Sequence, residues 1–289
     1  MKILVIGNGF LGSSIINRLE SEGHEVQVFS RRFREEIQSK QIIGNIFDYS
    51  NFEFMFSWQP QVVVNTAWVT SHNIYKNDTL NYQYAGFTAD LALRVLKSSV
   101  EHLVILGSCA EYGPQTAASS AGFTKLLPTE IYGQQKVAAF NSVHSSLIGS
   151  RVRLTWARVF QPYGPNQDGA RLIPYLIECL KDGREVEFKD TNTILDWVTT
   201  RDIASAISWI INHPAPTEVD IGTSIGYTNI ELLHHLEALM GLTQQSSLVV
   251  SKPQVSSRMN VVAKDSPLFT SGWLPADTLN SGLEWVLDS

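Results

Sequence analysis

The chain has 289 residues, with 22 Lys and Arg against 28 Asp and Glu and a formal net charge of −6. This length supports one large or two modest domains with a real hydrophobic core. The charge argues against nucleic acid or an anionic membrane surface as partner, and no apolar stretch approaches a membrane span. Two cysteines, Cys109 and Cys179, are too few for a disulfide framework, which favours the cytoplasm as a reducing compartment.

The N-terminal segment combines an apolar strand, a glycine-rich turn and a helix. Residues 3–6 are predicted to be a buried parallel strand, too short for a signal peptide, and helical spacing follows over residues 13–19. The intervening G-x-G-x-x-G is the turn that brings backbone and a helix N-terminus to a pyrophosphate. An ordinary glycine turn is the alternative. The predicted cofactor residues here are Gly7, Asn8, Gly9, Phe10, Leu11 and Gly12.

The end of the second predicted strand, residues 25–29, bears on cofactor choice. An NAD-selective site places Asp or Glu about 20 residues past the glycines, where it bonds the ribose 2′-hydroxyl. This chain instead has Ser30, Arg31 and Arg32. Guanidinium groups bind a 2′-phosphate in bidentate fashion, so we predict a preference for NADP(H), with NAD(H) possible. A solvated basic turn is the alternative for the arginines.

Apolar runs alternate with helical patterns through the first half of the chain. The predicted strands are 41–46, 62–67, 103–108 and 152–159, and the predicted helices are 80–96 and 129–147. This rhythm is typical of an α/β fold with a doubly wound parallel sheet, the Rossmann architecture.

After Phe160 the pattern changes. Residues 161–169 are rich in turn formers and are predicted to be a loop. The elements predicted beyond it are helices near 171–180, 202–211, 229–240 and 279–287, a strand at 185–188 and an extended stretch near 193–198. We predict an NAD(P)-binding domain of residues 1–165 and 194–222, where the second segment returns to the nucleotide-binding sheet. Residues 166–193 and 223–289 form a smaller C-terminal substrate-binding region.

Ser108, Tyr132 and Lys136 are the candidate catalytic residues. Tyr132 and Lys136 are four residues apart in a predicted helix and therefore share a face. An ammonium there favours the phenolate and lowers the tyrosine pKa from its usual ~10, which suits a general acid or base. Ser108 ends a predicted strand at the carboxyl edge of the sheet, where open α/β folds bind ligands. A surface tyrosine beside a lysine is the alternative.

These segments together resemble the extended short-chain dehydrogenase/reductases, in particular the NAD(P)-dependent nucleotide-sugar epimerase/dehydratase family. The resemblance covers nearly the whole chain. Its matching segments are Gly7–Gly12, Gly44–Ile46, Asn65–Ala67, Ser108–Gly113, Tyr132–Lys136, Arg158–Pro165, Leu195–Val198 and Gly272–Pro275. Three residues depart from the family pattern: Asn45 replaces Asp, Gln161 replaces Asn, and Leu195 replaces Arg.

The resemblance implies a role for each matched residue. Tyr132 would exchange a proton with a sugar hydroxyl or ketone, Ser108 would bond the same oxygen, and Lys136 would hold the nicotinamide ribose. Further cofactor contacts are predicted for Asn45, Ile46, Thr66, Ala67, Trp68 and Phe160. Substrate contacts are predicted for Thr70, Ser108, Cys109, Gln161, Arg171 and Arg258, and Trp68 and His72 could also line the sugar pocket. The arginines would clamp a diphosphate, with ordinary surface arginines as the alternative.

The residues after Ser108 limit which reactions of the family this chain is expected to catalyse. Nucleotide-sugar 4,6-dehydratases carry Asp-Glu where this chain has Cys109 and Ala110, so dehydration is not expected. GDP-fucose-synthase-like epimerases place their cysteine one residue later, which favours Cys109 as a packing residue rather than a base. The leading hypothesis is an enzyme of carbohydrate biosynthesis that reduces a nucleotide-linked 4-keto-6-deoxyhexose with NADPH. A 4-epimerase with bound NAD is the alternative, and a non-catalytic NADP-binding regulator is a third hypothesis.

The sequence also bears on metal binding and on the oligomeric state. His234 and His235 cannot place both rings on one helix face, and the other histidines lack ligand spacing, so no metal is expected. The resemblance implies a homodimer in which the helices 80–96 and 129–147 pair through apolar outer faces. The nucleotide base, the sugar and the stereochemistry at C4 stay open.

Overall fold

The structure is a computed structural model that describes residues 1–48, 50–71, 74–188, 190–242, 248–250 and 259–289. Its centre is a seven-stranded sheet in the order β10-β6-β5-β4-β1-β2-β3, in which every pairing is parallel. The strands are β1 (Lys2–Ile6), β2 (Glu25–Ser30), β3 (Lys40–Ile43), β4 (Val62–Asn65), β5 (His102–Ser108), β6 (Arg153–Val159) and β10 (Glu218–Ile221). The strand order reverses between β1 and β4, which is where open α/β sheets bind ligands.

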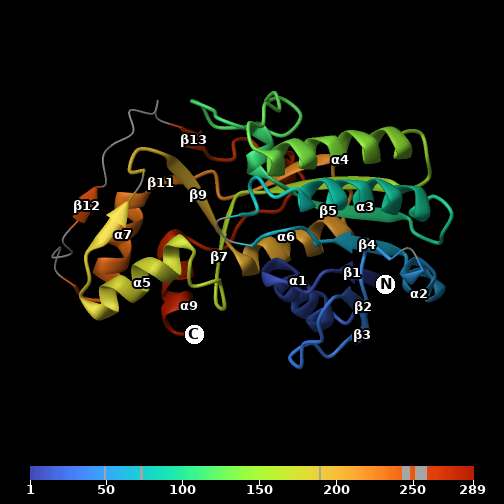
Figure 1. Cartoon of the computed structure of the whole chain (residues 1–289), viewed down its shortest axis with the longest axis horizontal. Coiled ribbons are helices and arrows are strands. Elements are labelled where there is room, and N and C mark those ends of the chain that lie inside the picture. Colours follow the sequence, from blue (N-terminus) through green and yellow to red (C-terminus); the bar gives the residue numbers. More distant parts are fainter. Residues whose placement is uncertain (49, 72–73, 189, 243–247, 251–258) are drawn as a thin grey trace.

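Helices cover both faces of this sheet (Figure 1). α1 (Phe10–Ser21) and α6 (Thr200–Asn212) pack together on one face, and α3 (Leu80–Val95) and α4 (Ile131–Leu147) pack together on the other. The central strands are buried on both sides, so they are almost continuously apolar rather than alternating. The short α2 (Asn51–Ser57) lies between β3 and β4 in the chain. The predicted doubly wound α/β fold is therefore confirmed.

A second, smaller region lies beside the large sheet (Figure 1). Its four-stranded sheet joins segments that are far apart in the chain: β7 (Gln161–Tyr163), β9 (Ile194–Thr199), β11 (Gly226–Thr228) and β13 (Asn260–Val261). The region also contains α5 (Leu172–Asp182), β8 (Val186–Phe188), α7 (Asn229–Leu239), β12 (Leu248–Val250) and α9 (Leu279–Leu287). The short α8 (Pro267–Thr270) instead packs against β10 of the large sheet. Leu176, Leu232 and Leu283 belong to a separate hydrophobic core that holds α5, α7 and α9 together.

Two predictions about the second half were wrong in part. Residues 161–163 form strand β7 rather than loop, because they pair with Trp197–Thr199, a partner that local turn formers do not reveal. The segment 194–222 returns to the large sheet through β10 and through α6, which packs on one of its faces, whereas β9 pairs with β7, β11 and β13 outside it. The division into two domains as a whole stays a prediction.

The outer surfaces of α3 and α4 are less apolar than predicted. α3 exposes the large apolar side chains Tyr82 and Leu93. The exposed positions of α4 are mostly small or polar: Gln134, Ala138, Asn141, Ser142 and Ser145. The large apolar residues of α4, Phe140, Val143 and Leu147, lie in the core, which leaves few for the outside.

Two further findings concern the chain as a whole. Among the helices of the described residues, none combines the length and the apolar character needed to cross a membrane. Cys109 and Cys179 are both free and buried, so neither forms a disulfide.

Candidate active site

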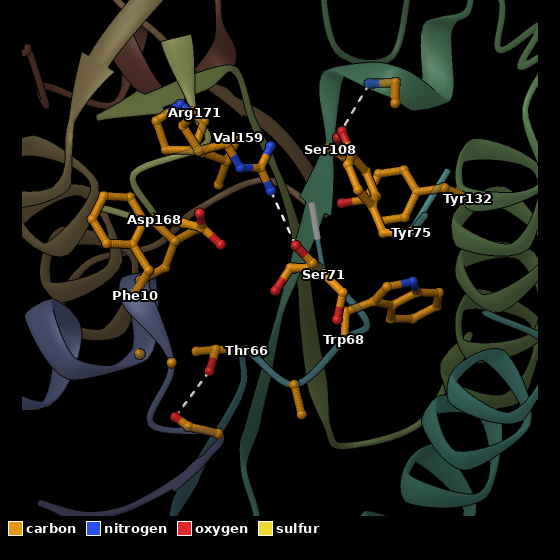
Figure 2. A pocket seen from close by; sticks show the side chains of 18 of the residues that line it. Phe10, Thr66, Trp68, Ser71, Tyr75, Ser108, Tyr132, Val159, Asp168 and Arg171 are labelled. Atoms are coloured by element: carbon orange, nitrogen blue, oxygen red, sulfur yellow. Dashed lines mark hydrogen bonds between the residues drawn. The ribbon is translucent and has the colours of Figure 1, made fainter. Parts of the chain in front are cut away.

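A cavity of about 1480 Å³ follows the carboxyl edge of the large sheet and reaches the small sheet. One end is formed by the glycine turn and the end of β2, and the other by residues after β4 and β5 together with β9 and α5. Figure 2 shows its walls, with Phe10 and Thr66 on one side and Ser108 and Tyr132 on the other. A single drug-sized ligand fills a few hundred cubic ångströms, so this volume accommodates a dinucleotide together with a second ligand.

The glycine turn leaves room for a ligand at Gly9, whereas Gly7 and Gly12 lie too close to other atoms to carry a side chain. A Cβ on Gly7, where φ is +100°, would come within 2.6 Å of the Thr66 hydroxyl oxygen, and a Cβ on Gly12 would collide with the Gly7 carbonyl. A Cβ on Gly9 would meet no protein atom within 4 Å. Gly9 also caps α1 without a side-chain hydrogen bond, so the first N–H groups of that helix are free for an anion. These features fit a pyrophosphate.

The end of β2 is tied to the glycine turn. The Ser30 hydroxyl and the Asn8 amide both donate to the Arg32 carbonyl, at 2.8 and 2.7 Å. The buried Ser30 hydroxyl is therefore engaged within the protein. Arg31 and Arg32 are exposed and line the cavity, which puts two guanidinium groups at its cofactor end.

The end of β4 forms the floor between the two halves of the cavity. The Thr66 hydroxyl lies 3.0 Å from the carbonyls of both Ile6 and Gly7 and bridges β1 to the turn. The Trp68 indole donates to Asn81 at 2.8 Å. Thr66, Ala67, Trp68 and Ile46 line the cavity, whereas the predicted cofactor residue Asn45 is not among its lining residues. The Asn45 side chain instead accepts a hydrogen bond from the Phe47 N–H.

Tyr132 and Ser108 meet at the cavity, and Lys136 lies behind them. Tyr132 is the second residue of α4 and packs edge-on against Tyr75, with ring centroids 5.0 Å apart. Ser108 ends β5, and its hydroxyl oxygen accepts the Ala110 N–H at 3.2 Å. The Lys136 ammonium donates to the Leu106 carbonyl at 2.6 Å and lies 3.9 Å from the centre of the Trp68 ring.

Burial controls the ionisation of these groups. It raises the pKa of Tyr132 above its usual value, although the nearby Ser108 side chain opposes the rise. Burial also lowers the pKa of Lys136 to about 7, against the opposing charge of Glu111. The predicted lowering of the Tyr132 pKa is thus not found, because desolvation outweighs an ammonium that is 5.9 Å from the Tyr132 ring and bound elsewhere.

Cys109 lines the cavity next to Ser108 but is a poor base. Burial raises the pKa of its thiol to about 12. Its sulfur accepts a weak hydrogen bond from the Gln161 amide at 3.8 Å. A thiol with this pKa stays protonated near neutral pH, which supports packing as its role.

Arg171 lies at the end of the cavity formed by β9, α5 and the residues after β4 and β5. We call it the sugar end, because the sugar is predicted to bind there. One guanidinium nitrogen donates to the Thr70 carbonyl at 3.1 Å, and the group lies 5.2 Å from the centre of the Tyr75 ring (Figure 2). Gln161, Phe160 and Thr70 also line the cavity. Arg258 and His72, the other residues predicted at this end, lie outside the described residues.

Several residues of the site were missed from the sequence. Tyr75, Lys76, Gln167 and Asp168 line the sugar end but sit in loops without a motif. Glu111 is fully buried directly behind Ser108, whose backbone N–H it accepts at 2.8 Å. The S-x-x-E capping-box pattern could have identified Glu111, since it pairs a serine with a glutamate three residues later.

The Rossmann sheet, the glycine turn and the Ser-Tyr-Lys set define an extended short-chain dehydrogenase/reductase. The model of the NAD dependent epimerase/dehydratase family matches residues 3–222, and the chain belongs to that family. It is therefore an enzyme of the nucleotide-sugar epimerase/dehydratase type.

Known proteins of similar sequence and structure agree with this. A UDP-glucose 4-epimerase of Lactobacillus helveticus is 22% identical over 278 residues, covering 84% of this chain and 82% of the relative. The structure of a Thermotoga maritima UDP-glucose 4-epimerase with UDP-glucose superposes with a TM-score of 0.86 at 22% identity, covering 100% of this chain and 98% of the other. A Thermus thermophilus UDP-glucose 4-epimerase in complex with NAD gives 0.87 at 20% identity, with the same coverage. At this identity the structures show a shared fold.

Proposed function

We propose that this enzyme inverts C4 of a nucleotide-diphosphate hexose by oxidising and re-reducing it, as a 4-epimerase. The observation that carries the proposal is the pairing of Ser108 and Tyr132 at the cavity with the un-ionised Cys109 and the methyl of Ala110 beside them. Such a site can move one proton and align one hydride at a single carbon. The curated relatives named UDP-glucose 4-epimerase support the same reaction.

Tyr132 is the proposed acid and base. It would return a proton to the C4 oxygen when the carbon is reduced from the opposite face, and it would remove that proton as the carbon is oxidised. For the second role, the positive charge of a bound oxidised nicotinamide must offset the effect of burial on the pKa of Tyr132. A nicotinamide cofactor held by the glycine turn at Gly9 would supply the hydride chemistry, since it could accept the hydrogen of C4 as hydride and return it. Lys136 is proposed to hold the nicotinamide ribose.

Ser108 binds the same substrate oxygen as Tyr132. Its hydroxyl oxygen already accepts the Ala110 N–H, so its hydrogen remains available for donation. A donor placed there stabilises negative charge on the oxygen as the hydride moves.

Elimination of water is not supported by this site. Dehydration needs an acid and a base beside the hydride site, and Ala110 offers neither. Cys109 would have to lose a proton from a thiol whose pKa burial raises to about 12. The same argument disfavours epimerisation at a carbon next to the ketone.

Arg171 is the proposed contact for the substrate diphosphate. Leu195 stands where the family pattern has arginine, so that cation is lost from β9. Arg171 lines the same cavity from the start of α5 and holds Thr70 through one nitrogen, which leaves the rest of its guanidinium for an anion. Thr70, Cys109 and Gln161 are proposed to surround the sugar.

Product analysis tests the epimerase proposal. UDP-, dTDP-, GDP- and CDP-linked glucose are each incubated with the purified enzyme and NAD or NADP, and the C4 epimers are separated by chromatography. We expect one donor to approach an epimer equilibrium without net change in nicotinamide absorbance. Absence of any epimer with every donor would overturn the proposal.

Reduction of a 4-keto-6-deoxyhexose with NADPH is a second candidate, favoured by Arg31 and Arg32. A reductase releases its oxidised cofactor each turn, and guanidinium groups at the cavity edge suit the 2′-phosphate of NADP(H). GDP-, dTDP-, CDP- and UDP-4-keto-6-deoxyhexoses are mixed with NADPH for this test. A stoichiometric loss of cofactor absorbance would identify the reductase.

We also propose a homodimer formed through α3 and α4. Tyr82 and Leu93 supply apolar contacts, and the small residues of α4 permit close helix packing. Sedimentation at micromolar concentration tests this, since monomer alone would contradict it. The cytoplasmic location stays a prediction.

A further inference from the structure

Three hydrogen-bond donors converge on the carboxylate of Glu111. They are the Ser108 backbone N–H at 2.8 Å, the Trp156 indole N–H at 3.0 Å and the Arg158 Nε at 2.7 Å. Glu111 and Arg158 are both fully buried. A buried carboxylate is costly unless it is paired and bonded, so these partners account for its presence behind the active site.

The surrounding strands hold this carboxylate in place. Trp156 and Arg158 alternate along β6, and Arg158 extends a second nitrogen to Glu218 on β10 at 2.8 Å. The backbone of β5 passes so close that a Cβ on Gly107 would come within 2.7 Å of a Glu111 oxygen and would also strike the Trp156 indole. The carboxylate is thus fixed by the sheet as well as by the short 3-10 helix η1 (Cys109–Tyr112) that carries it.

We propose that Glu111 is a positioning residue that holds Ser108 with its hydroxyl hydrogen directed at the reacting substrate oxygen. Glu111 fixes the Ser108 N–H, and Ser108 in turn accepts the Ala110 N–H through its hydroxyl oxygen. The Ala110 N–H fixes the position of the hydroxyl oxygen, and the hydroxyl keeps its one hydrogen for donation. The inference rests on the proposed role of Ser108 in proton and hydride transfer at C4, and it holds for either direction of that reaction.

Glu111→Gln is the direct test, because glutamine keeps the size but turns one oxygen into a donor that faces other donors. We expect kcat to fall about 10–100-fold, while KM and cofactor affinity change less than about twofold. The matched control is Trp156→Phe, which also removes a bond to Glu111 but leaves the Ser108 bond in place. Its kcat should stay within about twofold.

A double-mutant cycle separates positioning from general damage. If Glu111 acts through Ser108, adding Glu111→Gln to Ser108→Ala should change kcat less than about twofold. The same loss of kcat in both backgrounds would overturn the proposal, as would an unchanged kcat in the folded single variant. If Glu111→Gln does not fold, Glu111→Asp keeps the charge, withdraws it by one methylene group, and enters the same cycle.

Hydrogen exchange gives a readout that does not need turnover. In Glu111→Gln one amide oxygen must serve both Arg158 and Ser108, and the charged Arg158 is the stronger donor, so the amide nitrogen is expected to face Ser108. The peptide that contains Ser108 should therefore exchange faster in Glu111→Gln than in Trp156→Phe, which keeps the Ser108 bond. Equal exchange in the two variants would contradict the proposal. If no nucleotide sugar is turned over, the proposed function fails, whereas this measurement still tests Glu111.

Discussion

The two ends of the cavity are built in different ways. The cofactor end uses backbone: Gly9 leaves an open cradle, and the free N–H groups of α1 surround it. The sugar end uses side chains from separate elements, with Tyr132 on α4, Ser108 on β5 and Arg171 at the start of α5. A backbone site is encoded in a few consecutive residues, whereas a side-chain site depends on how distant elements pack.

Substitution of Tyr132 should have the largest effect, and it acts on the sugar end alone. Tyr132→Phe keeps the ring against Tyr75 but removes the hydroxyl. We expect kcat to fall by about 10²–10⁴, the range of general acid–base catalysis, with little change in cofactor affinity. Steady-state kinetics and cofactor titration check this. Near wild-type turnover would show that the catalytic group is another residue.

A methyl group at Gly9 should damage the cofactor end alone. Gly9→Ala meets no protein atom, and φ of −72° suits alanine, so folding should be unaffected. Displacing the pyrophosphate from the N–H groups should weaken cofactor binding on the order of 100-fold, about 2–3 kcal/mol. Gly86→Ala, at an exposed glycine of α3 with the same open surroundings, is the control. Unchanged cofactor affinity in Gly9→Ala would show that the pyrophosphate does not bind at Gly9.

Arg31 and Arg32 are the side chains that the cofactor end adds to its backbone groups, so their removal tests how much side chains contribute to cofactor binding. Arg31→Ala with Arg32→Ala should weaken NADPH binding by about one to two decades, or ~1.5–3 kcal/mol, through loss of charge-assisted bonds to the 2′-phosphate. NADH affinity should stay nearly constant. Titration of both cofactors decides this, and tighter binding of NADH by the unchanged protein would show that the arginines form only a solvated turn.

Substitution of Cys109 should have the smallest effect on kcat, although Cys109 lies beside Ser108. Burial raises the pKa of the thiol, so it remains protonated below pH of about 12 and cannot serve as a base in the working range. Cys109→Ser should therefore keep kcat within about threefold from pH 6 to 9. A loss of two decades with folding intact would make Cys109 a catalytic group.

The contrast between the two ends explains what the sequence could predict. Most strands and helices of the large sheet, including α1 and the Gly7–Gly12 turn, follow from local apolar patterns, whereas α2 and strand β10 were not predicted. Strand β7 was missed because Gln161–Tyr163 becomes a strand only by pairing with β9, over thirty residues away. Arg171 was proposed from the sequence, but its contact with Thr70, 101 residues earlier in the chain, was not foreseeable.

Ionisation was the least predictable property of the site. The spacing of Tyr132 and Lys136 placed both on α4, but it could not show that the ammonium binds the Leu106 carbonyl. Nor could it show that burial raises the pKa of Tyr132 and lowers that of Lys136 to about 7. Desolvation depends on every neighbour of a group, and those neighbours come from the whole fold.

An isotope experiment tests C4 epimerisation most directly. The nucleotide sugar that gives an epimer is prepared with deuterium at C4 and converted with NAD or NADP present but unlabelled. Because one bound cofactor accepts and returns the same hydrogen, the account predicts that the product keeps deuterium at C4, as seen by mass spectrometry and proton NMR. Loss of deuterium to the cofactor pool or to solvent would contradict it.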